Sequence, residues 1–327
     1  MHKLAFLFVL IAAMQIGRAA DLRLEDVPYP FPVKTYKLST QQQDLEMSYM
    51  DVAPSGQSRG TILLLHGKNF NGAYWEETAN ALSAQGYRVI IPDQIGFGKS
   101  SKPNRYQYSF HQLAQNTHSL LTNLNVSEVH ILGHSMGGML AIRMALLYPE
   151  STKSLTLVNP IGLEDWQMKG VPYQTPDQWY QQEFKQTAEK IRTYQKENYY
   201  HGEWNPHYER WVEQAAATLR SPNYSTIAWN QALAYEMIYT QPVCHEFSRI
   251  KVPTLLIIGQ KDRTAIGANL ASADVRQTLG DYPKLGRATA LKIPNSTLAE
   301  LEGIGHVPHI ENFGRFIEPL KTFLASK

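Results

Sequence analysis

A serine lies at the centre of the glycine-rich segment Gly133-His134-Ser135-Met136-Gly137-Gly138. The apolar run at residues 129–132 predicts a buried strand before it, and the apolar run at 139–145 predicts a helix after it. Glycines two residues either side of Ser135 fit a tight strand-to-helix turn that strains the serine backbone and exposes its hydroxyl. The start of the helix adds free N–H groups that could stabilise an oxyanion. The pattern is short enough to occur by chance, but its strand and helix context indicates a nucleophilic serine.

A nucleophilic serine needs a base, and the base needs a carboxylate to orient it. Asp262 follows a predicted buried strand at residues 252–259 and is the candidate acid. His306 lies on a glycine-rich turn after a second predicted strand, at residues 289–293, and is the candidate base. The residue types therefore allow acyl transfer by a Ser-His-Asp triad.

Each partner of the serine has an alternative. His309 is a second candidate for the base. Glu164 and Asp165, in the loop after a predicted strand at 154–158, are a second source of the acid. Asp262 could instead be a solvated loop carboxylate paired with the basic residues beside it. The residue types alone leave these choices open.

The chain resembles the α/β-hydrolase superfamily from about residue 47 to the C-terminus, with a gap in the middle. Five features occur in the family's order: His66-Gly67 after a predicted strand at 61–65, the segment 92–100 after a predicted strand at 87–91, the Ser135 turn, the Asp262 loop and the His306 turn. The resemblance implies a mostly parallel, eight-stranded α/β sheet with helices on both faces. It also implies that Ser135, His306 and Asp262 are the catalytic triad.

The resemblance further implies an oxyanion hole formed by the backbone N–H groups of Lys68 and Met136. Many relatives carry glycine or an aromatic residue after His-Gly, whereas this chain has Lys68-Asn69-Phe70. Asp93 and the glycines after it are interpreted as a structural turn without a catalytic role.

Composition restricts the class of protein. The chain has 327 residues, 43% of them hydrophobic, which suits one large globular α/β domain with an insertion. Its net charge is only +2, and no basic stripe is present, so no nucleic-acid partner is expected. No metal-ligand spacing stands out among its histidines, and we expect neither a metal nor a cofactor. Oligomeric state is left open.

The N-terminus predicts export. A short charged start precedes about eleven apolar residues, too few to span a bilayer, and a small-residue stretch follows near Ala19 and Ala20. We interpret residues 1–20 as a cleavable signal peptide, so the protein is expected to be periplasmic or secreted. Cys244 is the single cysteine, which leaves no internal disulfide for the exported chain. Proline-rich residues 21–44 are expected to form an N-terminal arm.

The rest of the chain divides into a core and an insertion. Strands alternate with helices at 74–84, 110–124 and 136–148, as in a parallel sheet covered on both faces. The core is assigned to residues 45–159 and 248–327, beginning with an edge strand near 45–52. Residues 160–247 are predicted to be helical and are rich in Trp and Tyr. In the position where relatives carry a cap, they are expected to form a helical lid.

These features predict a serine hydrolase that acts on a small, largely apolar ester-like substrate through an acyl-enzyme. Hydrolysis of carbon–carbon bonds in diketone-like ring-cleavage products is an alternative that the Ser135 turn does not separate from ester hydrolysis. Two alternatives belong to other classes: a non-catalytic small-ligand-binding protein on this fold, and a lyase or cofactor-free oxygenase that uses the same triad. The serine argues against related dehalogenases and epoxide hydrolases, which need aspartate at this position.

Overall fold

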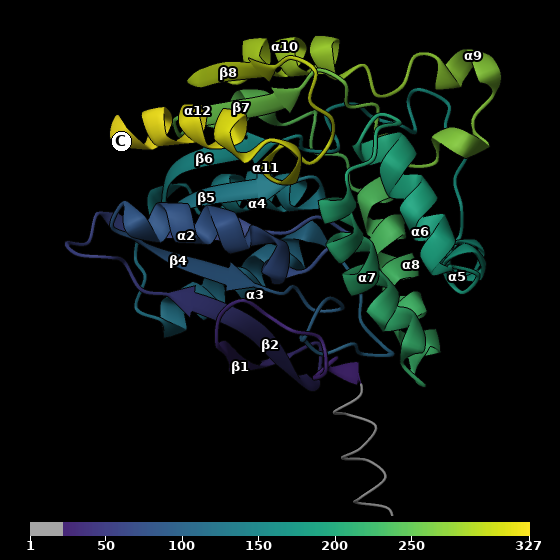
Figure 1. The fold of residues 1–327 in the computed structure, drawn as a ribbon, viewed down its shortest axis with the longest axis horizontal. Coiled ribbons are helices and arrows are strands. Elements are labelled where there is room, and N and C mark those ends of the chain that lie inside the picture. The colour runs from purple at the N-terminus through teal and green to yellow at the C-terminus, as the bar shows by residue number, and fades with distance from the viewer. Residues whose placement is uncertain (1–21) are drawn as a thin grey trace, which may run out of the picture.

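The computed structural model describes residues 22–327, and the predicted signal peptide at 1–20 lies outside them. One sheet with the strand order β1-β2-β4-β3-β5-β6-β7-β8 forms the centre of the molecule (Figure 1). The strands are β1 (Val33–Thr40), β2 (Gln43–Val52), β3 (Gly60–Leu65), β4 (Tyr87–Pro92), β5 (Val129–His134), β6 (Thr152–Val158), β7 (Thr254–Gly259) and β8 (Ser296–Leu301). Strands β3 to β8 are parallel, β2 pairs antiparallel with β4, and β1 pairs antiparallel with β2. The predicted fold class, an eight-stranded and mostly parallel α/β sheet, is confirmed.

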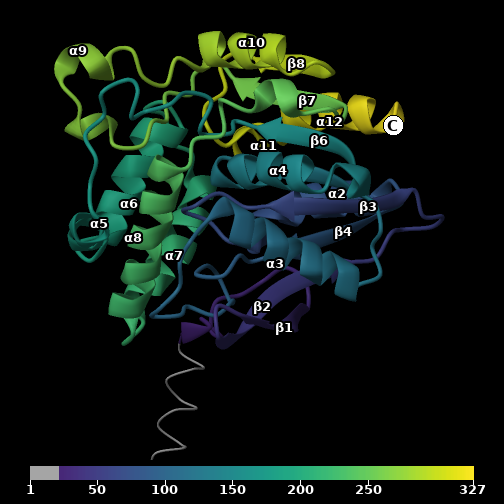
Figure 2. The same cartoon turned by 180° about the vertical axis from the view of Figure 1, so that it is seen from behind.

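Helices cover both faces of this sheet (Figures 1 and 2). The core helices are α2 (Glu76–Ala84), α3 (Phe110–Asn123), α4 (Met136–Leu147), α9 (Ala273–Arg276), α10 (Tyr282–Lys292), α11 (Pro308–Glu311) and α12 (Phe313–Ala325). Alternate residues of β3 serve opposite faces, as the period of a strand requires. Leu63 and Leu65 pack in the cluster that contains α3 and α4, whereas Ile62 and Leu64 pack in the cluster that contains α2 and α12.

The segment between β6 and β7, residues 159–253, is mostly helical and is called the insertion below. Its helices are α5 (Pro176–Glu183), α6 (Ala188–Tyr194), α7 (Glu209–Ala217) and α8 (Tyr224–Thr240), and a π-helical turn, Gln195–Tyr199, continues α6. The four helices form a group of their own beside the sheet, on the right in Figure 1. Many rings of the insertion pack on one another, with Trp179 stacked on Tyr235 at 4.5 Å and Tyr200 on Tyr208 at 3.6 Å between ring centroids.

The last strand differs from the prediction. The prediction of a strand at 289–293 is wrong. These residues lie at the end of helix α10, and strand β8 begins at Ser296. The apolar residues there follow the period of a helix: Leu291 is 89% exposed, while Tyr282, Gly286 and Thr289 are buried at helical spacing. The Asp281 side chain caps this helix by accepting from the N–H of Lys284.

The N-terminal region contains one strand more than expected. Strand β1 lies within the segment interpreted as an arm, and it forms the sheet edge, so β2 pairs with β4 instead of lying at the edge. Gln41 and Gln42 join β1 to β2 with φ of 49° and 58°, the left-handed conformation of a two-residue hairpin turn. The sequence of β1 is largely polar and half exposed, so its hydrophobic pattern is weak.

Among residues 22–327, no helix combines the length and apolar character that crossing a membrane would require.

Candidate active site

Ser135 occupies the turn between β5 and α4. Its φ of 55° and ψ of −122° are strained for a residue with a side chain. The backbone packing around it leaves no room for side chains at the flanking glycines. A Cβ at Gly133 would lie 2.1 Å from the carbonyl oxygen of Gly137, and one at Gly137 would lie 2.2 Å from that of Leu65. The glycines of the motif are therefore required by close backbone approach, as the sequence predicts.

The structure brings the three predicted triad side chains together. Nε2 of His306 lies 3.0 Å from Oγ of Ser135, and Nδ1 of His306 lies 2.7 Å from Oδ2 of Asp262. The carboxylate accepts the Nδ1 proton, which leaves the Nε2 lone pair free to accept the serine hydroxyl proton. Ser135 is 7% exposed, and the other two are fully buried. This is the hydrogen-bonding order that serine activation requires.

Asp262 is held by a residue that the sequence analysis did not select. Its Oδ2 also accepts from Nδ2 of Asn159 at 2.7 Å, and its Oδ1 accepts from the N–H of Thr264 at 2.8 Å. Asn159, directly after β6, uses its Oδ1 to accept the N–H of Gly259 at 3.0 Å. Three donors thus satisfy the buried carboxylate and fix its orientation. The sequence feature that could have pointed to Asn159 is its position as a polar residue directly after a buried strand.

The backbone of His306 is fixed on two sides. Its N–H donates to the carbonyl oxygen of Tyr199 at 2.9 Å, and its carbonyl oxygen accepts from Nε2 of His134 at 2.8 Å. Tyr199 belongs to the insertion, and its ring also stacks on the His306 imidazole with a centroid distance of 4.8 Å. The Tyr199 hydroxyl accepts from Nδ2 of Asn69 at 2.7 Å. One insertion residue therefore contacts both His306 and the loop after β3, which no local sequence pattern reveals.

A second connection runs from the loop after β3 to His306 through neutral groups. The Tyr74 hydroxyl accepts the N–H of Gly67 at 2.9 Å and donates to Nδ1 of His134 at 3.1 Å. Nε2 of His134 then donates to the His306 carbonyl oxygen. Burial holds the pKa of His134 well below its ordinary value, and the nearby imidazoles of His306 and His309 lower it further. A neutral His134 suits this chain, in which each ring nitrogen has a single role.

The predicted oxyanion donors belong to segments next to Ser135. Within the described part of the chain, neither the N–H of Lys68 nor that of Met136 has an acceptor. Met136 is the first residue of α4, where N–H groups have no intrahelical partner. A Cβ at Gly67, which precedes Lys68, would lie 3.1 Å from Cβ of Ser135. Two free donors near the serine can stabilise negative charge that develops on a bound carbonyl oxygen.

The alternative site residues have other partners. The His309 ring stacks on Trp75 at a centroid distance of 4.4 Å, and neither of its nitrogens has a hydrogen-bond partner among residues 22–327. Glu164 accepts from the N–H of Gly280 at 2.8 Å and pairs with Lys169. Asp165 pairs with His245 at 2.8 Å. None of these three alternatives is hydrogen-bonded to His306 or Ser135.

Asp93 also matches its structural interpretation. Its carboxylate accepts hydrogen bonds from the N–H of Gly72 at 2.7 Å and of Lys99 at 2.8 Å, and from the Tyr29 hydroxyl at 2.6 Å. It therefore joins three separate segments of the chain below the site.

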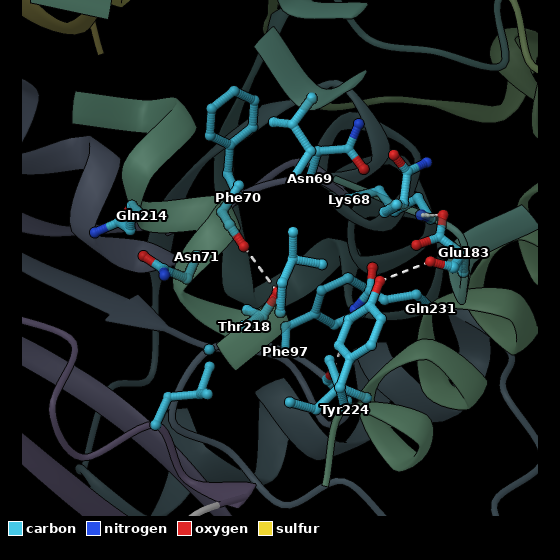
Figure 3. A pocket seen from close by; sticks show the side chains of 18 of the residues that line it. Lys68, Asn69, Phe70, Asn71, Phe97, Glu183, Gln214, Thr218, Tyr224 and Gln231 are labelled. Carbon is cyan, nitrogen blue, oxygen red and sulfur yellow. Dashed lines mark hydrogen bonds and ion pairs between the residues drawn. The ribbon is translucent and has the colours of Figure 1, made fainter. Parts of the chain in front are cut away.

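A cavity of about 340 Å³ adjoins the loop after β3, between that loop and the insertion (Figure 3). The Lys68 side chain enters it and pairs with Glu183 at 3.1 Å, with its ammonium 3.4 Å from the ring centroid of Tyr235. Ser135 itself does not line this cavity, so Lys68 is the connection: its backbone lies beside Ser135 and its side chain lies in the cavity. Apolar atoms supply most of the surface of the cavity, and side-chain amides supply part of the rest.

Comparison with known proteins agrees with this geometry. Residues 60–313 match the family described as alpha/beta hydrolase fold. The chain therefore belongs to the α/β-hydrolase family.

Particular relatives cover most of the chain. It is similar to the crystal structure of a probable hydrolytic enzyme from Pseudomonas aeruginosa PAO1, with 51% identity, a TM-score of 0.91, and coverage of 92% of this chain and 97% of that chain. It is 28% identical over 282 residues to Lipase 1 of Psychrobacter immobilis, covering 84% of this chain and 80% of the lipase. It is 27% identical over 269 residues to a pimeloyl-[acyl-carrier protein] methyl ester esterase of Aeromonas hydrophila, covering 80% and 94%.

The close packing at the Ser135 turn predicts a large effect of one methyl group. Gly137→Ala should lower the free energy of unfolding by about 3 kcal/mol or more, because its Cβ would meet the carbonyl of Leu65. Gly314→Ala is the matched control, since its nearest neighbour would be 3.9 Å away, at the start of α12. It should leave stability unchanged or raise it by up to about 1 kcal/mol. Urea unfolding measures both, and equal effects would contradict the packing argument.

Burial of His309 predicts a specific acid sensitivity. Burial, with a smaller contribution from His306, lowers the pKa of His309 to about 3, against an ordinary value of 6.5. The unfolded chain therefore binds this proton first, and the associated stability is complete above pH 6.5 and lost as the pH falls toward 3. Between pH 7 and pH 5, the loss from this group should be about 2 kcal/mol.

Urea unfolding of wild type and His309→Leu at the two pH values tests this expectation. The variant should lose about 2 kcal/mol less than wild type over the same interval. An identical pH dependence in both proteins would show that His309 does not titrate as its burial requires.

Proposed function

We propose that this protein is a carboxylic ester hydrolase that uses Ser135 as its nucleophile. The observation that carries the proposal is the hydrogen-bonded order Ser135, His306, Asp262, with distances of 3.0 and 2.7 Å. The ester-hydrolase names of Lipase 1 and of the methyl ester esterase support the same reaction class.

The proposed mechanism has two steps. Nε2 of His306 takes the Ser135 hydroxyl proton while Oγ attacks the ester carbonyl, and the resulting imidazolium is stabilised by Asp262. The tetrahedral oxyanion accepts hydrogen bonds from the N–H groups of Lys68 and Met136. His306 then gives its proton to the leaving alcohol. Water, activated by His306, attacks the acyl-enzyme and releases the acid.

The insertion is proposed to act as a lid over this site. Its Tyr199 and Glu183 contact the His306 turn and Lys68, so the insertion closes the space above the carboxyl ends of the strands. Export to the periplasm or the medium is proposed from the sequence of residues 1–20.

The first test removes the nucleophile and the base. Ser135→Ala and His306→Ala should each lower kcat/KM for p-nitrophenyl butanoate about a thousandfold or more, because the two act as one unit. The circular dichroism spectrum should not change. A Ser135→Ala preparation, purified from an esterase-deficient host, that kept wild-type turnover would exclude the proposed nucleophile.

The second test compares the two sources of the acid. Asp262→Asn should lower kcat strongly, about 10⁴-fold, because an amide favours the wrong tautomer of His306. Glu164→Gln, the control, should remain within about threefold of wild type, since its carboxylate binds Gly280 and Lys169. The reverse ranking would transfer the acid to the loop after β6.

The third test concerns the insertion residue on His306. Tyr199→Phe keeps the ring and backbone contacts but loses the hydrogen bond from Asn69, so kcat should fall about three- to tenfold with little change in KM. Asn69→Ala should have a similar effect, and the double variant should add little, because both remove one interaction. Tyr208→Phe, in the same insertion, is the control. Fully additive effects on kcat would show that the Tyr199–Asn69 hydrogen bond does not support the site.

A further inference from the structure

The Lys68 side chain is enclosed by two helices of the insertion. Its ammonium pairs with Glu183, the last residue of α5, at 3.1 Å, and lies 3.4 Å from the ring centroid of Tyr235, in α8. The side chains of Lys68 and Glu183 are only 6% and 12% exposed. Figure 3 shows the two side chains directed at one another beside the cavity. The loop after β3 is therefore joined to the insertion by a nearly buried ion pair.

The groups that surround the Lys68 ammonium are themselves fixed. The Tyr235 ring of α8 stacks on Trp179 of α5 at a centroid distance of 4.5 Å. The backbone carbonyl oxygen of Glu183 accepts from the hydroxyl of Tyr224, in α8, at 2.6 Å. These contacts join α5 to α8 next to the ammonium. The position of the Lys68 side chain therefore depends on where these two helices lie against the core.

Stability alone does not explain a lysine at this position. Burial lowers the pKa of Lys68, because it removes the ammonium from water, and the Glu183 carboxylate opposes this shift. The cost of desolvating two charges largely cancels their attraction, so a pair of apolar side chains of similar size would join the insertion to the core about as well. An ion pair differs from an apolar contact in its geometry, since the ammonium is directed to one carboxylate.

The backbone of Lys68 has a use for such geometry. Its N–H is one of the two proposed oxyanion donors and has no acceptor within residues 22–327. A Cβ at the preceding residue, Gly67, would lie 3.1 Å from Cβ of Ser135. The core fixes Gly67 through the Tyr74 hydroxyl, whereas the insertion fixes Lys68 through its side chain. An oxyanion donor stabilises the transition state only when it is held at the place where the charge develops.

We propose that Glu183 is a positioning residue: by pairing with the Lys68 side chain, it holds the Lys68 backbone N–H in the oxyanion hole for the ester hydrolysis proposed at Ser135, on which this inference rests. The oxyanion hole is then complete only while α5 lies against the loop after β3. Movement of the insertion away from the core would displace a donor as well as open the site. Because the hole acts on the transition state, loss of the pair should lower kcat more than it changes KM.

Kinetics with p-nitrophenyl butanoate test the proposal. Glu183→Gln should lower kcat about tenfold or more and change KM less than about twofold. Lys68→Met, which keeps the backbone N–H, should have a similar effect. The double variant should be no worse than either single variant, because all three lose the same ion pair. Glu209→Gln, which removes an ion pair with Arg192 within the insertion, is the control and should keep the wild-type kcat.

An oxyanion analogue distinguishes positioning from a general loss of structure. Propyl trifluoromethyl ketone carries the acyl chain of the same substrate. Oγ of Ser135 bonds to its carbonyl carbon, the serine proton passes to His306, and the carbonyl electron pair becomes the negative charge of a hemiketal oxygen in the hole. Its inhibition constant should rise about tenfold in Glu183→Gln and in Lys68→Met, in proportion to the loss of kcat/KM. In Glu209→Gln it should not change.

The outcomes separate this inference from the proposed function. If wild type hydrolyses the ester but Glu183→Gln keeps its kcat and its affinity for the ketone, the inference is wrong and ester hydrolysis stands. Equal losses in Glu209→Gln, or losses of kcat/KM without a rise of the inhibition constant, would also overturn the inference. If wild type neither hydrolyses the ester nor binds the ketone, the proposed function fails, and the inference fails with it.

The double variant keeps the test valid if a single variant does not fold. Glu183→Gln leaves the Lys68 ammonium buried without its partner, which can be strongly destabilising. Circular dichroism at the assay temperature shows whether each variant is folded. The double variant has no unpaired charge at this position, and it should show the same losses of kcat and of ketone affinity. Wild-type values of both in the folded double variant would overturn the inference.

Discussion

The site depends on backbone segments that approach one another more closely than side chains would allow. Gly137 packs on the carbonyl of Leu65 at the end of β3, and a Cβ at Gly259, at the end of β7, would lie 2.1 Å from the carbonyl oxygen of Gly305. These contacts bring the ends of β3, β5 and β7 and the His306 turn to one edge of the sheet, where ligands bind in open α/β folds. The strained Ser135 backbone is tolerated because these surroundings fix it.

Three buried histidines around this edge are neutral. Burial lowers the pKa of His66, His134 and His309, so these imidazoles serve as uncharged hydrogen-bonding or packing groups. His66 illustrates the role: its Nε2 accepts the N–H of Gln94 at 3.1 Å, while Nδ1 contacts the Gly67 carbonyl. The Asp262 carboxylate, with three donors, is thus placed to interact with positive charge that arises on His306. The three neutral imidazoles add no competing positive charge beside His306.

Whether the sequence predicted a part of this site depends on how far apart along the chain the interacting residues lie. The positions of Ser135, His306 and Asp262 were accessible because each lies in a short motif after a strand, and parallel strands end at one edge. Asn159 carried a weaker signal of the same kind. Tyr199 carried none, because its contacts with His306 and Asn69 arise only when the insertion folds over the core. Strand β8 was misplaced because Ala290, Leu291 and Ile293 form an apolar cluster around the end of α10, whereas only half of the residues of the true strand are apolar.

The composition of the insertion predicted the mostly apolar surface of the cavity but not the polar side chains that line the rest of it. The insertion is rich in Trp and Tyr, which suggested an apolar pocket, but several of these rings stack on one another. Half-buried amide side chains, Gln214 and Gln231 among them, also line the cavity. Residue content therefore predicted the helices but not which side chains line the cavity.

The central claim is that Ser135 forms a covalent acyl intermediate. Rapid acid quench of the enzyme during turnover of a slowly deacylating ester, followed by peptide mass spectrometry, tests it most directly. The account predicts that the peptide containing Ser135 gains the mass of the acyl group minus one hydrogen, and that His306→Ala shows no such gain on the same time scale. Steady turnover with no acylated peptide, or an adduct on another residue, would contradict it.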